Sequence, residues 1–554
     1  MELKELLTRG IQTALQEAVR NGELPDGDYP AVLLEVPPQK EFGDFASNIA
    51  MQSARIARRS PRDIANTIIS HMEYSWLNKA EVAGAGFINF FLNHTVLYDA
   101  LKGILASGSA YGQAPLRADD TVQVEYVSAN PTGPLHVGHG RGAAYGSALV
   151  NLLRAAGYRV EAEYYINDAG NQMNNLAASV NARYLQLLGK EAEIPENGYH
   201  GQDIIDTAQA IIDQDGAAYL EMDEATRLEL FKDRAYAEKL KALKRDLEHF
   251  NVHYDRWFSE RTLHPQAIEA ACAVLKRDGK VYEQDGALWL RSTAYGDDKD
   301  RVVIRDNGVP TYLAADIAYH KNKYDRGFHS LINIWGADHH GYVARVKAAM
   351  AALGYDPQRL EILLLQMVSL FRNGEVVKMS KRTGQAITLN ELIEEVGTDA
   401  ARYFFIMRSL DTQLDFDLDL ATSRSNENPV YYIQYAHARI YSVYRQIEEK
   451  GGTVPDTWDD VDWSRLCEEP ELALIKKMTA FPEEIQKAAV NREPHRLAHF
   501  VHELAGLFHT FYNQCHIIQS DKELEKARLA LITAVRITIA NSLAVLGISA
   551  PKEM

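Results

Sequence analysis

The chain has 554 residues, of which 46% are hydrophobic and 24% charged, and its formal net charge is −17. This length predicts about three or four domains, and the composition is typical of a soluble globular protein with several cores. No charged-then-apolar leader follows Met1 and no apolar run reaches the length that crosses a bilayer, so we expect a cytoplasmic protein with no membrane partner.

The negative charge argues against a protein that grips duplex nucleic acid through overall basicity, and we expect no DNA partner. Any RNA must be bound through local basic strips and through shape. The three cysteines, Cys272, Cys467 and Cys515, lie far apart and form no CxxC pair. They fit a reducing compartment and argue against zinc, so no protein-bound metal is predicted.

Residues 1–112 are predicted to form a compact α+β module. Helical spacing covers 3–21, and an apolar segment at 31–36 predicts a short strand. Later in the module, a glycine turn precedes a second apolar strand, Phe87–Phe91. A stretch with glycine and proline near 108–115 predicts the boundary with the next domain.

Residues 113–427 begin with a strand, a helix and a second strand, a βαβ unit that predicts a Rossmann-type parallel sheet. The first strand covers 122–127 and the helix 135–156. A charged, mostly helical insertion near 188–280 interrupts the pattern. We expect later strand-like segments to complete the same sheet, at 287–290, 301–305, 331–335 and 361–368.

Residues 428–554 have helical periodicity almost throughout, which predicts an all-α bundle. Four helices are expected, at 431–447, 472–490, 497–515 and 524–546. The predicted fold class is therefore α/β: a Rossmann-type parallel-sheet domain with an α+β N-terminal domain and a C-terminal helical bundle.

A histidine motif, His136-Val137-Gly138-His139, follows the first strand of the βαβ unit and opens its helix. The free N–H groups and the dipole of a helix start favour a phosphate there. Both histidines lie on one face of the first turn and can donate hydrogen bonds to the α-phosphate of ATP, while Gly138 leaves room for adenine. Two alternatives stay open: a histidine pair that only caps a helix, and a small nucleotidylyltransferase, which shares this spacing.

A lysine motif, Lys378-Met379-Ser380-Lys381, lies at the far end of the same domain and is followed by Arg382. Lys378 and Lys381 can offer cations to the β- and γ-phosphates as pyrophosphate leaves, and we expect Met379 and Ser380 to contact ATP beside them. Such a run alone is more often a solvated face. Together with the histidine motif it indicates a nucleotide site.

A third segment places Gly336, Asp338 and His339 directly after the strand expected at 331–335. They should lie at the carboxyl edge of the sheet, where nucleotide sites are found. Asp338 can bind ribose hydroxyls and His339 can help hold adenine. A metal cluster is the weaker alternative, because no other segment offers a matching pair of ligands.

Acidic residues are expected beside the histidine motif. Glu125 and Asn130 lie on the strand and loop before it, and Tyr312 and Asp316 share one face of a later helix. Two carboxylates with a phenol suit a cation, and bidentate pairing would favour a guanidinium over an ammonium. A solvent-exposed edge carboxylate for Glu125 and a helix-start role for Asp316 remain alternatives.

The histidine and lysine motifs resemble the HIGH and KMSKS signatures of class I aminoacyl-tRNA synthetases, with Arg382 where many members carry serine. Longer runs, spread over essentially the whole chain, resemble the bacterial arginyl-tRNA synthetase family. They are Glu125–His136, Tyr165–Gln172, Trp257–Glu260 and Gly336–Tyr342. The segment Asn428–Arg439 is similar to the DALR anticodon-binding domain of that family.

The resemblance implies an arginine–tRNA ligase that uses ATP and Mg²⁺, forms arginyl-adenylate and transfers arginine to tRNA(Arg), as an expected monomer. It assigns Glu125, Tyr312 and Asp316 to the guanidinium and Asn130 to the other end of arginine. It also implies that adenylate formation requires bound tRNA.

The resemblance further implies two surfaces that bind tRNA. In the N-terminal module, Phe87 and Asn89 match positions that contact an exposed loop nucleotide, with a role in RNA binding favoured for Asn89 and a buried core position equally open for Phe87. In the bundle, Tyr435 and Arg439 are an i,i+4 pair that can stack on splayed bases.

Three rival functions remain: a class I synthetase for another amino acid such as lysine, a nucleotidylyltransferase, and an inactive RNA-binding relative. The last would show damaged signatures, whereas both signatures here are intact.

Overall fold

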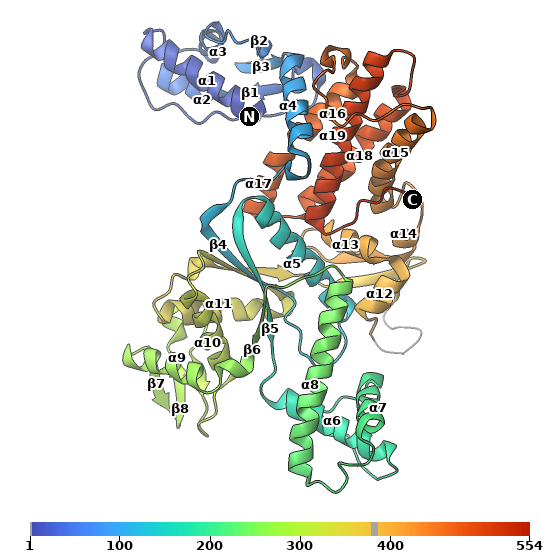
Figure 1. Ribbon diagram of the computed structural model, residues 1–554. Helices are drawn as coiled ribbons and strands as arrows, with labels where there is room; N and C mark the ends of the chain where they lie inside the picture. The colour runs from blue at the N-terminus through green and yellow to red at the C-terminus, as the bar shows by residue number, and fades with distance from the viewer. Residues whose placement is uncertain (1–2, 378–385) are drawn as a thin grey trace.

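The computed structural model describes residues 3–377 and 386–554 (Figure 1). A small N-terminal module and a helical bundle that holds the C-terminus lie side by side at one end of the molecule. The central domain extends away from them into two lobes, one around α9–α11 and one around α6–α8.

The N-terminal module packs three helices against an antiparallel sheet of order β1-β3-β2. Its elements are α1 (Leu3–Arg20), η1 (Lys40–Phe42), β1 (Phe45–Ser47), α2 (Ile49–Ala57), α3 (Pro61–Ser70), β2 (Leu77–Ala83) and β3 (Phe87–Leu92). The strand expected at 31–36 is wrong, because this segment makes only an isolated bridge between Glu35 and Ala46. Pro37 and Pro38 follow at once and have no N–H group with which to extend a ladder.

The central sheet has five parallel strands in the order β11-β10-β4-β5-β6, which confirms the predicted Rossmann-type sheet. The strands are β4 (Arg117–Glu125), β5 (Tyr158–Ile166), β6 (Arg256–Ser259), β10 (Ser330–Gly336) and β11 (Leu360–Leu365). After β4, the strands β5 and β6 are added on one side of it, and the later strands β10 and β11 on its other side. The strand order therefore switches between β4 and β10. A crevice outside the carboxyl ends of strands is expected at such a switch point.

Two expected strands of this sheet lie elsewhere. β8 (Ala287–Leu290) and β9 (Arg301–Ile304) form a separate antiparallel sheet with β7 (Val281–Gln284). Asp285 and Gly286, both with positive φ, form a two-residue turn between β7 and β8. Such a turn joins antiparallel neighbours, so β8 pairs with β7 and not with the parallel central sheet. Conversely, the edge strand β6 comes from inside the stretch expected to be mostly helical.

The helices of the central domain cover the sheet and build the two lobes. They are α5 (Val137–Ala155), α6 (Asn171–Leu187), α7 (Gln202–Asp215), α8 (Glu224–His249), α9 (Gln266–Arg277), α10 (Tyr312–Asp325) and α11 (His340–Ala352). α5 is buried along most of its length, and Gly146 lets it approach β4 closely, since a Cβ there would lie 2.3 Å from the Tyr126 ring. α6 and α7 pack with α8 around a core of their own.

A second small sheet follows the Rossmann strands and leads to the bundle. It has the order β13-β12-β14 and is flanked by short helices. These elements are β12 (Val368–Arg372), β13 (Glu375–Val377), α12 (Leu389–Val396), α13 (Thr398–Ile406), β14 (Leu414–Asp417) and α14 (Leu418–Thr422).

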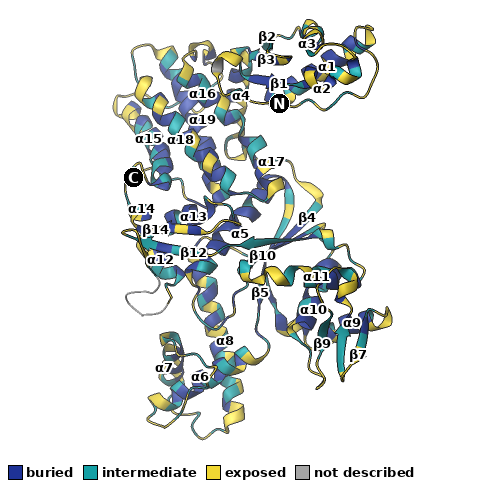
Figure 2. Ribbon diagram, turned by 180° about the vertical axis from the view of Figure 1, so that it is seen from behind, coloured by how far each residue is buried: buried dark blue, intermediate teal, exposed yellow. Residues whose placement is uncertain are grey.

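The C-terminal bundle confirms the predicted all-α architecture. Its helices are α15 (Pro429–Glu449), α16 (Glu469–Thr479), α17 (Phe481–Asn491), α18 (His495–Gln514) and α19 (Lys522–Leu546), and α4 (His94–Ser107) packs on α16 and α19. The single helix expected at 472–490 is two helices, because Pro482 starts a new one. α19 is long and apolar enough to cross a membrane, but 72% of its most apolar window is buried inside the protein, as in the core helix of a bundle (Figure 2).

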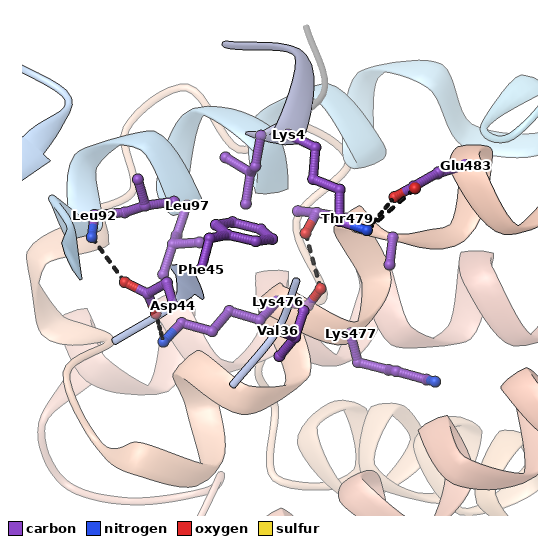
Figure 3. A pocket seen from close by; sticks show the side chains of 12 residues that line it. Lys4, Val36, Asp44, Phe45, Leu92, Leu97, Lys476, Lys477, Thr479 and Glu483 are labelled. Atoms are coloured by element: carbon purple, nitrogen blue, oxygen red, sulfur yellow. Dashed lines mark hydrogen bonds and ion pairs between the residues drawn. The ribbon is translucent and has the colours of Figure 1, made fainter. Parts of the chain in front are cut away.

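The N-terminal module meets the bundle across a cavity of about 360 Å³ with a mostly apolar lining that includes Phe45 (Figure 3). Two ion pairs bridge it, Lys4 with Glu483 at 3.0 Å and Lys476 with Asp44. A different contact joins the bundle to the central domain. Arg402 of α13 is buried and donates to the carbonyls of Leu546 and Phe250 and to Ser147 Oγ of α5.

Candidate active site

The histidine motif follows β4, which is the strand at which the strand order of the sheet switches. Between strand and helix, Val127 and Ser128 have φ values of 69° and 44°. A β-branched residue in the left-handed region is strained, and strain of this kind is concentrated at functional loops. The loop turns the chain so that α5 starts shortly after the carboxyl end of β4, where Glu125 lies.

His136 is the N-cap of α5, and its ring is locked against that of His139. Nδ1 of His136 accepts from the N–H of Gly138 at 3.1 Å, and Nδ1 of His139 accepts from the N–H of His136 at 3.3 Å. The two rings stack with centroids 3.7 Å apart. Because both Nδ1 atoms accept, each neutral ring carries its proton on Nε2.

Both histidines are neutral near pH 7. Burial lowers the pKa of His136, and burial together with the neighbouring His136 lowers the pKa of His139 to about 4. The pair therefore offers two Nε2–H donors that keep their protons over the whole neutral range. Such preorganised donors suit the charge that develops on a phosphate in a transition state.

Lys378, Met379, Ser380 and Lys381 lie outside the described residues, but both flanks of their segment are defined. β13 ends at Val377 on one side. On the other, Leu389 donates from its N–H to the carbonyl of Leu135 at 2.8 Å, and Val137 donates to the carbonyl of Ile387 at 3.3 Å. The chain after the lysine motif is thus paired with the chain of the histidine motif.

Gly336 ends β10, whose register places Asn333 beside Glu125 of β4. Asp338 and His339 follow in η5 (Ala337–His339), and their side chains are exposed and lie 3.6 Å apart. Gly336, Asp338 and His339 therefore lie at or directly after the carboxyl end of β10, which is the strand next to β4.

Glu125 is only 6% exposed and is paired with Lys323 of α10. The Lys323 ammonium donates to Glu125 Oε2 at 2.5 Å and to Asn333 Oδ1 at 2.8 Å, and it lies 4.5 Å from the centre of the Tyr319 ring. Glu125 Oε1 accepts from Ser128 Oγ at 2.9 Å. The alternative of a solvent-exposed edge carboxylate does not hold, because this group is buried and hydrogen-bonded.

Asp316 lies about two turns before Lys323 on α10 and accepts from the hydroxyl of Tyr342. Burial raises its pKa to about 7, although the Tyr342 hydrogen bond acts in the opposite direction, and the charges of Glu260 and Glu125 raise it further. Lys323 offsets part of that repulsion. A carboxyl group held at such a pKa is poised to release its proton when a cation arrives.

Glu260 completes the acidic cluster and was missed from the sequence. It starts η3 (Glu260–Leu263), is 5% exposed, and its Oε2 accepts from the Asn167 amide at 3.1 Å in the orientation that satisfies both residues. Lys323 and Tyr342 were missed as well. Lys323 lies seven residues after Asp316, on a nearby face of the same helix, but this spacing does not distinguish a buried lysine from a solvated one.

The other two residues predicted to bind arginine lie at the rim. Tyr312 is the first residue of α10 and is 62% exposed, and Asn130 is exposed in the loop before the histidine motif. The structure thus places the buried Glu125 close enough to the half-buried Asp316 for its charge to raise the pKa of Asp316. Tyr312 and Asn130 are exposed.

The residues predicted to bind RNA divide by burial. Phe87 is 36% exposed on β3, whereas Asn89 of the same strand is 3% exposed, with β1 and β2 on either side. In the bundle, Arg439 donates to the Tyr435 hydroxyl at 2.8 Å and lies 4.4 Å from that ring and 4.6 Å from the Tyr512 ring. Tyr435 and Arg439 are half-buried and form a stacked cationic unit.

Comparison with known families separates the chain into three matched parts. Residues 100–408 match the catalytic domain described as tRNA synthetases class I (R), residues 5–92 match the arginyl tRNA synthetase N terminal domain, and residues 433–554 match the DALR anticodon binding domain. The fold and the paired signatures are therefore those of a class I aminoacyl-tRNA synthetase.

Relatives with curated names extend over the whole chain. An arginine–tRNA ligase of Carboxydothermus hydrogenoformans is 53% identical over 100% of both chains, and one of Heliobacterium modesticaldum is 51% identical over 100% of both. Among solved structures, a putative arginyl-tRNA synthetase from Campylobacter jejuni has a TM-score of 0.78 at 37% identity, covering 84% of this chain and 100% of its own. The arginyl-tRNA synthetase of Thermus thermophilus shares the fold, with a TM-score of 0.75 at 24% identity over 100% of both chains. The chain belongs to the arginyl-tRNA synthetase family.

Proposed function

We propose that the chain ligates arginine to tRNA(Arg) in two steps. The carboxylate of L-arginine attacks the α-phosphorus of ATP, which forms arginyl-adenylate and releases pyrophosphate. A hydroxyl of the terminal ribose of tRNA then attacks the arginyl carbonyl, and AMP leaves. The chemistry needs no side-chain nucleophile, because positioning and electrostatic stabilisation supply the catalysis.

The observation that supports arginine is the buried acidic cluster at the switch point. The charges of Glu125 and Glu260 both raise the pKa of Asp316, and Lys323 supplies the single ammonium among the described groups that act on it. An additional cation is favoured there, and two carboxylates from different elements suit a planar guanidinium. Tyr312 and Asn130 at the rim are proposed to hold the rest of the substrate.

For ATP, we propose that the Nε2–H groups of His136 and His139 bind the α-phosphate, with Gly138, Gly336, Asp338 and His339 around the nucleoside. Lys378 and Lys381, with Met379 and Ser380, are proposed to bind the departing pyrophosphate. Mg²⁺ is proposed to arrive with the ATP phosphates, since the described residues contain no cluster of three or more His, Cys, Asp or Glu side chains that could hold it.

The proposed RNA contacts are Phe87 in the N-terminal module and the Tyr435–Arg439 unit in the bundle, with Asn89 supporting the strand below Phe87. A monomer in the cytoplasm is proposed from the family, as is the need for bound tRNA before adenylate forms.

ATP–pyrophosphate exchange tests the proposal. Exchange is expected with arginine and not with lysine, and only when tRNA is present. Exchange with lysine alone would refute the assignment of arginine, and equal exchange without tRNA would refute the requirement for tRNA.

A further inference from the structure

Lys323 is a lysine with no exposed surface, placed inside a site that is proposed to receive a cation. A buried ammonium is costly unless each of its protons has an acceptor. Here Glu125 Oε2 lies at 2.5 Å, Asn333 Oδ1 at 2.8 Å and the Tyr319 ring face at 4.5 Å. The three N–H groups are therefore all engaged, and the ammonium has one defined position.

The contact with Asn333 extends this arrangement to the helical turn that carries Asp316. Asn333 is fully buried, and its Nδ2 donates to Nε2 of His320 at 2.9 Å. Nδ1 of His320 donates to the carbonyl of Asp316 at 2.8 Å. Each of these hydrogen bonds has one defined donor and one defined acceptor. The series from Lys323 through Asn333 and His320 to the carbonyl of Asp316 therefore donates in one direction throughout.

This direction requires a neutral His320, because a protonated ring would present an N–H to the Asn333 amide. Burial, together with the nearby Lys323 charge, lowers the pKa of His320 to about 3 and keeps it neutral. The amide of Asn333 is consequently held with its oxygen toward Lys323.

We propose that Lys323 is a positioning residue for substrate arginine, which orients the Glu125 carboxylate and ties it to the Asp316 turn so that both carboxylates are preset for a guanidinium. This inference rests on the proposed function. Lys323 holds Oε2 of Glu125 and Ser128 Oγ holds Oε1, so the orientation of the carboxylate is fixed while each oxygen can still accept a further hydrogen bond. Its charge also limits the repulsion between Glu125 and Asp316.

The groups that act on Asp316 come from several elements, and Lys323 is the cation among them. They are Tyr342 of α11, Glu260 of η3, Glu125 of β4, Lys323 of α10 and Tyr165 of β5. Removing the Lys323 charge leaves only carboxyl and phenol groups in this set. The proton on Asp316 is then harder to displace, and arginine binds less tightly at neutral pH.

The test is calorimetric titration of arginine into the full chain between pH 5.5 and 9, which measures Kd without turnover. Lys323→Gln removes the charge but keeps an N–H donor for Glu125. We expect Kd for arginine to rise about tenfold or more at pH 7.5, because the hydrogen bond between two charged groups is replaced by a weaker one from a neutral donor. The pH midpoint of binding should also move upward.

Lys323→Arg separates charge from position. It restores the cation, so the pH midpoint should stay near the wild-type value, but its planar fork displaces Glu125 and Kd should remain raised. Lys239→Gln is the matched control, because Lys239 is a buried lysine that pairs with Asp203 at 2.6 Å in the insertion lobe. Its loss should lower the unfolding temperature without changing Kd for arginine.

Wild-type Kd and midpoint in Lys323→Gln would overturn the inference and leave Lys323 a purely structural ion pair. If Lys323→Gln does not fold, a wild-type Kd in Lys323→Arg has the same meaning. A wild-type chain that binds arginine but supports no exchange would refute the proposed ligase reaction and not the positioning role. A wild-type chain that does not bind arginine would refute both.

Discussion

The N–H of Leu389 donates to the carbonyl of Leu135, and this 2.8 Å bond joins the two signature segments of the site. Leu135 immediately precedes His136, and Leu389 starts α12. Thr388, between Ile387 and Leu389, caps α12 through the N–H of Glu391, so the pairing is anchored at a helix start. The lysine motif therefore leads directly into the segment that pairs with the histidine motif.

Lys381→Ala tests the assigned role of the lysine motif. The charge of Lys381 is proposed to act on the pyrophosphate as it leaves, which is a transition-state contact. The exchange rate should fall by roughly two to three orders of magnitude, as when one electrostatic donor is removed. Calorimetric Kd for arginine should change less than threefold. Lys276→Ala, an exposed lysine of α9, is the control and should leave both unchanged. Near-normal exchange in Lys381→Ala would contradict the role.

Because the histidine pair is neutral, we expect the exchange rate not to change with histidine titration near neutral pH. Because the pKa of His139 is lowered to about 4, it is neutral from pH 6 upward and keeps its Nε2–H donor. His139→Ala should reduce the exchange rate about a hundredfold or more, and His139→Gln, which keeps an N–H in a similar place, should lose less. The wild-type exchange rate at saturating arginine should show no step attributable to histidine between pH 6 and 8. A step near pH 6.5 would show that the ring titrates as in water.

The same depressed pKa affects stability. A folded-state pKa below the unfolded value means that the unfolded chain binds more protons between the two, so His139 and His320 favour folding above about pH 6.5 and this contribution is lost as pH falls toward 4 and 3.

The pKa of Asp316 is shifted upward, opposite to the histidines, and we therefore expect a proton to be released when arginine binds. Its pKa is raised to about 7, so below that value arginine must displace a proton. Kd for arginine should rise about tenfold per unit as pH falls below 7 and be flat above it. Without arginine, ionising Asp316 costs folding stability, and this cost appears as pH rises toward 7. Calorimetry in two buffers of different ionisation enthalpy measures the proton release. Asp316→Asn should bind arginine weakly with no such dependence; retained dependence would assign the proton to another group.

Much of the fold follows from patterns that are local in the sequence. The βαβ unit and three of the four expected bundle helices have strong periodicity and are confirmed, whereas the helix expected at 472–490 is two helices. The errors arose where short strands carry no information about their partners. The Asp285-Gly286 turn is a hairpin signal that separates β8 and β9 from the main sheet, and β6 has four residues within a helical stretch.

Site residues that belong to a motif can be predicted from the sequence. Residues whose role depends on whether the side chain is buried are harder to predict. Glu125 and Asp316 could be paired from chemistry, because a cation needs more than one carboxylate. Lys323 could not be assigned, since a lysine on an amphipathic helix is usually solvated and only the packing of α10 against β4 buries it. The sequence also does not show that the side chain of Phe87 is exposed while that of Asn89 is buried, because this depends on how β3 packs in the folded chain.

Gly547 allows a test of how much the buried Arg402 contact between the bundle and the central domain contributes to stability. It ends α19 with φ 70°, and a Cβ there would lie 2.3 Å from Nη2 of Arg402. Gly547→Ala should cost about 2 to 3 kcal/mol, from the left-handed backbone and from displacing a buried guanidinium. Gly451→Ala is matched, because Gly451 has φ 77° and its Cβ would meet nothing within 4 Å, and should cost about 1 kcal/mol. Chemical denaturation measures both; equal costs would show that Arg402 moves freely.

Phe87 and Asn89 offer a test within one strand, two residues apart and on the same side of β3 by alternation. Phe87→Ala removes an exposed ring proposed to stack on an unpaired base, so KM for tRNA should rise about fivefold to a hundredfold while the unfolding temperature stays within a degree or two. Asn89→Ala removes a buried side chain from the central strand of the sheet, so it should lower the free energy of unfolding by about 1 to 3 kcal/mol. KM for arginine and for ATP should remain normal in both variants. If Asn89→Ala raised KM for tRNA without loss of stability, the order of the two residues deduced from burial would be wrong and Asn89 would contact RNA itself.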